Sequence, residues 1–163
     1  MRIEEEIKLD YSDVLFRPKR STLKSRKDVD LNRTYTFKHS KLKWKGTPII
    51  ASNMDGVGEI NIAKKLLSHK LMTALTKQHS IKQIGSINNN SSFHNFVALS
   101  CGTSPDSFNR LNSILKKYPK FQFIWIDVAN GYSENFSHFV SNVRKKYPKK
   151  SSIAGNVVTA DMA

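Results

Sequence analysis

Residues 116–133 read KKYPKFQFIWIDVANGYS, and this stretch decides the fold that the sequence predicts. Its apolar run 123–126 is typical of a buried strand, and polar residues follow the run from Asp127 onward. The pentapeptide Lys-Lys-Tyr-Pro-Lys at 116–120 recurs at 145–149, 29 residues later, again in front of a predicted strand. A helix end that recurs before successive strands predicts consecutive βα units.

The same alternation of strand and helix patterns extends outward from this stretch over most of the chain. Ser104-Pro105 is typical of a helix start, with serine as the N-cap and proline at the first helical position. The sequence therefore predicts a parallel α/β fold that follows an irregular segment, residues 1–45. The predicted strands are 47–52, 72–75, 96–100, 122–126 and 152–155, and two predicted helix faces consist of Phe108, Leu111, Leu115 and Tyr118, and of Phe136, Phe139, Val140, Val143 and Tyr147.

The composition is that of an ordinary globular domain. With 163 residues, of which 39% are hydrophobic and 25% charged, the chain fits one domain. Its single cysteine, Cys101, excludes an internal disulfide, and no apolar run approaches the roughly 18 residues that a membrane span needs. The first residues carry three acids and lack the apolar region of a secretory signal. We therefore expect a cytoplasmic protein without a membrane span.

The formal net charge of +14 raises the question of a nucleic-acid partner. Lysine outnumbers arginine 20 to 7, although arginine is the better reader of bases and phosphates. The densest basic stretch, residues 17–27, contains no aromatic residue. Since AT-rich codons favour lysine, asparagine and isoleucine, base composition accounts for the charge. We expect no nucleic-acid partner.

Polar residues and glycines follow every predicted strand, at the face that carries the site in βα barrels and open parallel sheets. Asp127 comes directly after four apolar residues, at the rim of the predicted core. A charge without a partner is unfavourable there because it loses its hydration, so a functional carboxylate is favoured over a helix cap. Lys77, after Thr-Ala-Leu-Thr, is well placed for an anionic ligand. Cys101 fits small core filling better than a nucleophile. The five histidines have no metal-ligand spacing, and the sequence has neither a P-loop nor a GxGxxG motif.

Long motifs, rather than composition, point to a family. They are LDYSDVLFRPKRSTLKSR at 9–26, TFKHS at 36–40, NMD at 53–55, IDVANGYSE at 126–134 and AGNVVT at 154–159. These segments resemble the GMP reductases of the IMP dehydrogenase/GMP reductase family, and the resemblance extends over the whole chain. The related IMP dehydrogenases carry an inserted regulatory module after the second helix, whereas residues 81–92 lead straight to the third strand here. The Arg-Pro-Lys-Arg-Ser motif is the reductase version.

The resemblance implies a (β/α)8 TIM barrel, of which residues 1–163 are the N-terminal part. Residues 1–45 lead into it, and residues 46–163 supply about the first four and a half βα units. The implied activity is that of a homotetrameric oxidoreductase of purine metabolism, which uses NADPH to reduce GMP to IMP and ammonia. In that family a cysteine attacks the purine C2, ammonia leaves, and hydride from NADPH resolves the covalent intermediate.

The resemblance also implies roles for individual residues. No residue of this chain is expected to bind a metal, and the monovalent cation (K+) of the family is expected beyond residue 163. The implied catalytic residue is Lys77, beside the cofactor and the purine. Contacts with the adenosine end of a cofactor in a neighbouring subunit are implied for Ser25 and Arg26. Contacts in the nicotinamide pocket are implied for Asp127, Val128 and Ala129. Substrate-binding or supporting roles are implied for Met54, Asn130 and Asn156.

The sequence departs from the family pattern around the implied site and in length. The family shows His-Lys-His where this chain has Thr76-Lys77-Gln78, and threonine after Asn-Met-Asp where this chain has Gly56. A complete barrel has about 250 residues. The cysteine nucleophile and the GMP phosphate site are therefore expected beyond Ala163, and the chain alone is expected to be inactive. Two interpretations stay open: the N-terminal part of a GMP reductase, or a truncated homologue that binds intact reductase subunits or comes from a decaying gene.

Overall fold

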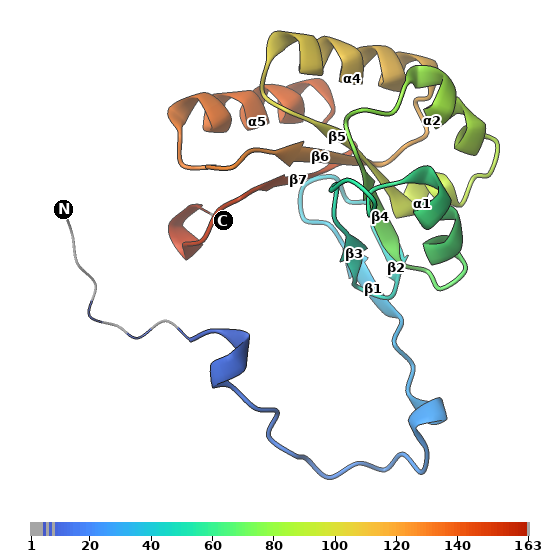
Figure 1. The fold of residues 1–163 in the computed structure, drawn as a ribbon, viewed down its shortest axis with the longest axis vertical. Helices are drawn as coiled ribbons and strands as arrows, with labels where there is room; N and C mark the ends of the chain where they lie inside the picture. The colour runs from blue at the N-terminus through green and yellow to red at the C-terminus, as the bar shows by residue number, and fades with distance from the viewer. Residues whose placement is uncertain (1–4, 6, 8, 163) are drawn as a thin grey trace. The chain divides into compact units, whose positions relative to one another are not determined.

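The computed structural model describes residues 5, 7 and 9–162, and the chain divides into two units, residues 1–30 and 31–163. The larger unit is built on a parallel sheet of five strands in the order β3-β4-β5-β6-β7 (Figure 1). Its strands are β3 Ile50–Ala51, β4 Met72–Leu75, β5 Val97–Cys101, β6 Phe123–Asp127 and β7 Ser151–Gly155; its helices are α1 Ile60–Leu67, α2 Ile81–Asn88, α3 Phe93–Phe96, α4 Pro105–Lys117, α5 Glu134–Lys146 and the 3-10 helix η3 Ala160–Met162.

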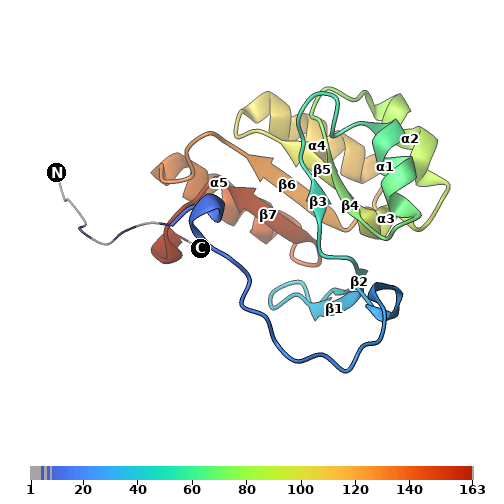
Figure 2. The same ribbon diagram turned by 60° about the horizontal axis from the view of Figure 1, so that its bottom comes forward.

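Each strand of this sheet pairs in parallel with the next strand along the chain. The sheet is curled, as half of a barrel is, and the connecting helices lie along one of its faces (Figure 2). This arrangement confirms the predicted fold class, an α/β protein with about the first four and a half βα units of a TIM barrel.

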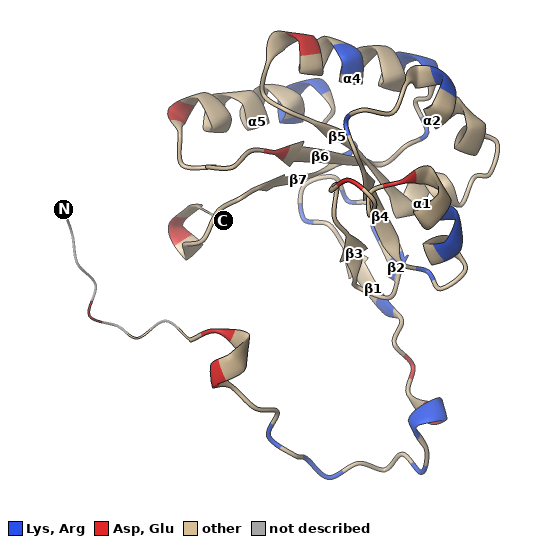
Figure 3. Ribbon diagram, viewed as in Figure 1, with Lys and Arg blue, Asp and Glu red and all other residues tan. Residues whose placement is uncertain are grey.

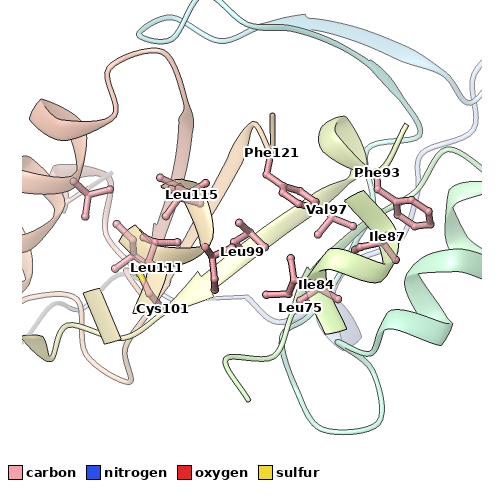
Figure 4. Packing of buried hydrophobic residues seen from close by; sticks show 14 of the residues in the cluster. Leu75, Ile84, Ile87, Phe93, Val97, Leu99, Cys101, Leu111, Leu115 and Phe121 are labelled. Carbon is pink, nitrogen blue, oxygen red and sulfur yellow. The ribbon is translucent and has the colours of Figure 1, made fainter. Parts of the chain in front are cut away.

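The core lies mainly between the sheet and its helices, where Leu75, Leu99, Leu111 and Leu115 pack together (Figure 4). Alternate residues of each strand face opposite sides of the sheet, so both faces are buried and the strands are nearly continuous apolar runs. In β6, for example, residues 124 and 126 belong to the helix-side cluster and residue 123 to the cluster on the other face.

The helix ends agree with the sequence predictions. Ser104 is the N-cap of α4, where its hydroxyl accepts a hydrogen bond from the Ser107 amide, and proline occupies the first helical turn. Both copies of Lys-Lys-Tyr-Pro-Lys end a helix, because α4 stops at Lys117 and α5 at Lys146. The tyrosine after each end leaves the helical conformation.

A two-stranded antiparallel hairpin occupies part of the segment that the sequence analysis expects to be irregular. Its strands are β1 Arg33–Thr36 and β2 Lys43–Gly46. Trp44 is buried against the face of the sheet opposite the helices, and its Nε1 donates to the Asn95 carbonyl at 2.9 Å. In the sequence, lysines alternate with Trp44 and Gly46 in this segment, and this short alternation is the available indication of a strand; in the structure it corresponds to alternate exposed and buried residues.

The edge strand β3 is shorter than the predicted 47–52, whereas the other four strands match their predictions to within one residue at each end. Pro48 has no amide hydrogen to donate, which limits ladder pairing at the start of β3. The chain nevertheless stays beside β4, since the Thr47 amide donates to Lys70 and the Met72 amide to Ile49.

The described part of the N-terminal unit contains two 3-10 turns, η1 Tyr11–Asp13 and η2 Arg26–Asp28, and its described residues up to 30 are exposed. Figure 3 shows Lys and Arg on this unit as well as on α1, α4 and α5, so the basic charge is spread over many elements. None of the helices in the described part of the chain has the length and apolar character to cross a membrane.

Candidate functional site

A hollow of about 570 Å³ lies at the carboxyl ends of β4, β5 and β6. Four residues assigned from the sequence line it together: Lys77, Asp127, Val128 and Ala129. Its volume is within the range of small-molecule sites, and the carboxyl ends of parallel strands are where such sites lie in this class of fold. This hollow is the candidate functional site.

Asp127 reaches the hollow because it is the last residue of β6. Ile126 before it is fully buried, whereas Asp127 is exposed. The side-chain nitrogen of Asn53, which follows β3, donates to the Asp127 carboxylate at 3.2 Å. This bond holds the carboxylate at the rim. The sequence analysis gives Asn53 no role, because the contact joins residues 74 positions apart.

Backbone hydrogen bonds fix the wall that Val128 and Ala129 form. The Val128 amide donates to Gly155, and the Asn156 amide donates back to Val128, both at 2.9 Å. The Gly131 amide then donates to Asn156 at 2.9 Å. The close approach requires a glycine there, because a Cβ on Gly131 would lie 2.6 Å from the Asn156 carbonyl oxygen. The loops after β6 and β7 therefore form one fixed structure.

The third side of the hollow comes from the loop between β5 and α4. Gly102, Thr103, Ser104 and Ser107 line it, and the Gly102 amide donates to the Ser107 hydroxyl at 2.7 Å. Ser104 caps α4, so the helix N-terminus opens toward the hollow and favours a negatively charged ligand there. No ligand role is predicted from the sequence for these four residues, although a Gly-Thr-Ser run directly after a strand is an indication of one.

Three other predicted site residues of the larger unit, Asn156, Met54 and Asn130, do not line this hollow. Asn156 lines a smaller one, of about 200 Å³, which also contacts Asp127. Met54 is 65% exposed in the turn after β3. Asn130 accepts a hydrogen bond from the Tyr132 amide at 2.9 Å, as a turn residue does. Ser25 and Arg26 belong to the N-terminal unit, where Ser25 caps η2.

Cys101 is part of the core rather than of the hollow. It is 1% exposed, and burial raises the pKa of its thiol to about 12, although Arg110 opposes that rise. A thiol in this state is protonated at neutral pH and cannot act as a nucleophile. These properties support the interpretation of Cys101 as core filling.

The chemistry available in the hollow is that of polar binding. It combines one ammonium group, one carboxylate, three hydroxyl groups and a helix N-terminus. Within residues 5, 7 and 9–162, no group of three or more His, Cys, Asp or Glu side chains could hold a metal ion. A ligand with both anionic groups and hydrogen-bond donors matches this set.

Comparisons with known proteins agree with the resemblance in the sequence. The family model of the IMP dehydrogenase / GMP reductase domain matches residues 8–163. GMP reductases of Shigella boydii serotype 4 (strain Sb227) and Escherichia coli (strain K12 / DH10B) are each 51% identical to this chain over 164 residues, which covers 99% of this chain and 47% of theirs. The chain thus spans about half the length of the curated relatives it matches.

The fold has a solved counterpart in the same group of proteins. The crystal structure of inosine 5′-monophosphate dehydrogenase from Legionella pneumophila superposes with a TM-score of 0.70 and 25% sequence identity, covering 91% of this chain and 44% of that one. The sequence motifs and the curled parallel sheet agree with these matches. The chain belongs to the IMP dehydrogenase/GMP reductase family.

Proposed function

We propose that this chain forms the cofactor-facing wall of a GMP reductase, an NADPH-dependent oxidoreductase that converts GMP to IMP and ammonia. The observation that carries the proposal is the hollow in which Lys77, Asp127, Val128 and Ala129 meet. Its chemistry fits a phosphate-bearing nicotinamide cofactor. Lys77 and the N-terminus of α4 favour phosphate, and the Asp127 carboxylate accepts hydrogen bonds, as from a carboxamide NH₂ group.

In this mechanism the chain's residues bind and orient. NADPH, when bound, supplies the hydride for the reduction. The Asp127 carboxylate accepts a hydrogen bond from the Asn53 side chain and binds one end of the ligand. The loops after β6 and β7 present Val128 and Ala129 as an apolar wall that limits water beside the ring. The Lys77 ammonium stabilises negative charge. Chemistry on the purine is assigned to the half of the barrel that the curated relatives have in addition.

The proposal extends to the assembly and setting of the complete protein. We propose a cytoplasmic homotetramer whose substrate is GMP. Ser25 and Arg26 serve the adenosine end of a cofactor in a neighbouring subunit. Met54, Asn130 and Asn156 support the purine side. K+ acts in the second half of the barrel. These assignments rest on the family membership and on the motifs that carry it.

An alternative role is binding to intact reductase subunits. The face of the sheet opposite the helices has an apolar hollow of about 300 Å³, lined by hairpin and strand residues that include Trp44, Met72 and Ile153. An apolar surface of this kind is typical of a protein–protein contact. Measurement of the native mass with and without a full-length relative separates the roles: a mixed oligomer favours the alternative.

Titration of the chain with NADPH, followed by the fluorescence of the cofactor, tests the proposed function. We expect saturable binding that Lys77→Met weakens by roughly 10- to 100-fold, as for loss of a charged hydrogen bond. Lys82→Met is the matched control, because Lys82 is an exposed lysine on α2. The absence of NADPH binding, or an equal loss in both variants, would contradict the proposal.

A further inference from the structure

His79 is a buried histidine that the proposed mechanism does not use. It lies two residues after Lys77, in the turn that follows β4, and is 7% exposed. Its Nε2 is 3.1 Å from the Gly58 carbonyl oxygen and 3.4 Å from Glu59 Oε2. Both neighbours are hydrogen-bond acceptors, so Nε2 carries a hydrogen and donates it.

The backbone around Lys77 is fixed on both sides. Before it, the Thr76 amide donates to the Gly58 carbonyl at 2.9 Å, the same oxygen that His79 contacts. After it, the His79 carbonyl accepts a hydrogen bond from the Arg110 guanidinium of α4. Ser80 then caps α2 in a reciprocal pair of bonds with Gln83. Lys77 and Gln78 are the exposed residues between these anchors.

The contact with Gly58 depends on an unusually close approach of two loops. A Cβ on Gly58 would lie 2.6 Å from the Ala74 carbonyl oxygen and 3.0 Å from the Thr76 amide nitrogen. The turn after β3 therefore packs directly against the end of β4. His79 also contacts this junction, since its imidazole lies within hydrogen-bond distance of the Gly58 carbonyl oxygen, which accepts a hydrogen bond from the Thr76 amide as well.

We propose that His79 is a positioning residue, whose imidazole holds the Lys77 turn against the Gly58–Glu59 turn and so aims the Lys77 ammonium into the hollow. This inference rests on the proposed cofactor site. A residue that only filled the core would need no hydrogen-bond donor here. Replacement of the imidazole by an apolar group leaves the Glu59 carboxylate without this partner and removes one of the bonds that hold the turn.

A double-mutant cycle on NADPH affinity tests the proposal. The variants are His79→Leu, Lys77→Met and the double variant, with His79→Gln to restore a donor at similar reach. We expect His79→Leu to weaken NADPH binding by roughly 3- to 10-fold, the range of one hydrogen bond. It should have no further effect when Lys77 is already methionine, because residues that act through one another are not additive. His79→Gln should recover most of the affinity.

Equal losses in the wild-type and Lys77→Met backgrounds would overturn the proposal, as would unchanged affinity in His79→Leu. If His79→Leu does not fold, Glu59→Ala takes its place in the cycle, since that residue lies at the surface end of the same contact and alanine has no acceptor for the imidazole. A wild-type chain that binds no NADPH would contradict the proposed function instead. Amide hydrogen exchange of His79→Leu against the wild-type chain then decides the positioning claim. Faster exchange confined to the Lys77 turn, at the Thr76 amide that donates to Gly58, supports it, and unchanged or chain-wide faster exchange overturns it.

Discussion

Substitution of Gly58 by alanine tests the loop junction under Lys77 directly. The added Cβ would lie 2.6 Å from Ala74 O, 2.9 Å from Asn53 Cα and 3.0 Å from Thr76 N, all of which are backbone atoms. Backbone cannot rotate away as a side chain can, so one of the two loops has to move. Overpacking of this kind costs about 1–3 kcal/mol. For a chain of this length, the cost lowers Tm by roughly 2–12 °C.

Gly102→Ala is the matched control for this change. A Cβ there meets only the Ser107 hydroxyl, at 3.7 Å, an ordinary van der Waals distance. Neither glycine has a positive φ, so alanine brings no backbone strain of that type at either position. Alanine at a compatible position stabilises by about 0.4–1 kcal/mol through the unfolded chain. The two variants should therefore shift stability in opposite directions.

Urea unfolding followed by circular dichroism measures both variants against the wild-type chain. We expect a lower midpoint with an unchanged slope for Gly58→Ala, and an equal or higher midpoint for Gly102→Ala. Similar midpoints for the two variants would show that the loops after β3 and β4 are not in the close contact described. His79 would then have no close junction of two loops to hold in place.

Two further predictions concern buried titratable groups. Because burial raises the pKa of Cys101 to about 12, its thiol should resist a disulfide reagent at about pH 8 in the native chain and react at once in urea; rapid native labelling would contradict the core placement. His94 is 5% exposed, and burial is the largest cause that lowers its pKa. In the unfolded chain His94 binds a proton near pH 6.5, whereas in the folded chain it does so only at lower pH. The free energy of unfolding should therefore fall as pH decreases below about 6.5. His94→Gln should flatten this dependence in urea midpoints compared at about pH 5 and about pH 7.5, and an equal pH dependence in both proteins would refute it.

The βα units could be predicted from the sequence because each one is a local pattern. The repeated Lys-Lys-Tyr-Pro-Lys segment marks two helix ends, and the apolar runs mark strands buried on both faces. The β1–β2 hairpin is not predicted from the sequence, because most of its residues fall in the segment expected to be irregular. Its stability depends on Trp44, which packs against strand residues that follow much later in the chain. Tertiary packing of this kind leaves only a weak local pattern.

The candidate site divides in the same way. Asp127 stands out because a charged residue directly after an apolar run has few structural explanations, and Lys77 stands out because it is a lysine two residues after the apolar end of a strand. Asn53 and His79 do not stand out, since each acts through a contact made in space. Asn53 reaches a carboxylate 74 positions away, and His79 reaches a carbonyl 21 positions away. The residues that orient the site are therefore the ones that only the structure brings to light.

The two departures from the family pattern around Lys77 fall on opposite sides of its turn. Thr76 is 5% exposed, so packing under the turn limits that position, whereas Gln78 is exposed. The anchors described for the turn come from Gly58, His79 and Arg110, and they do not require a histidine at either departure. The position of Lys77 in this chain therefore does not depend on a histidine at 76 or 78. What changes is its neighbour: an amide at position 78 does not titrate near neutral pH, whereas an imidazole does. Gln78→His should accordingly add a pH dependence near pH 6.5 to the NADPH titration that glutamine at this position does not give.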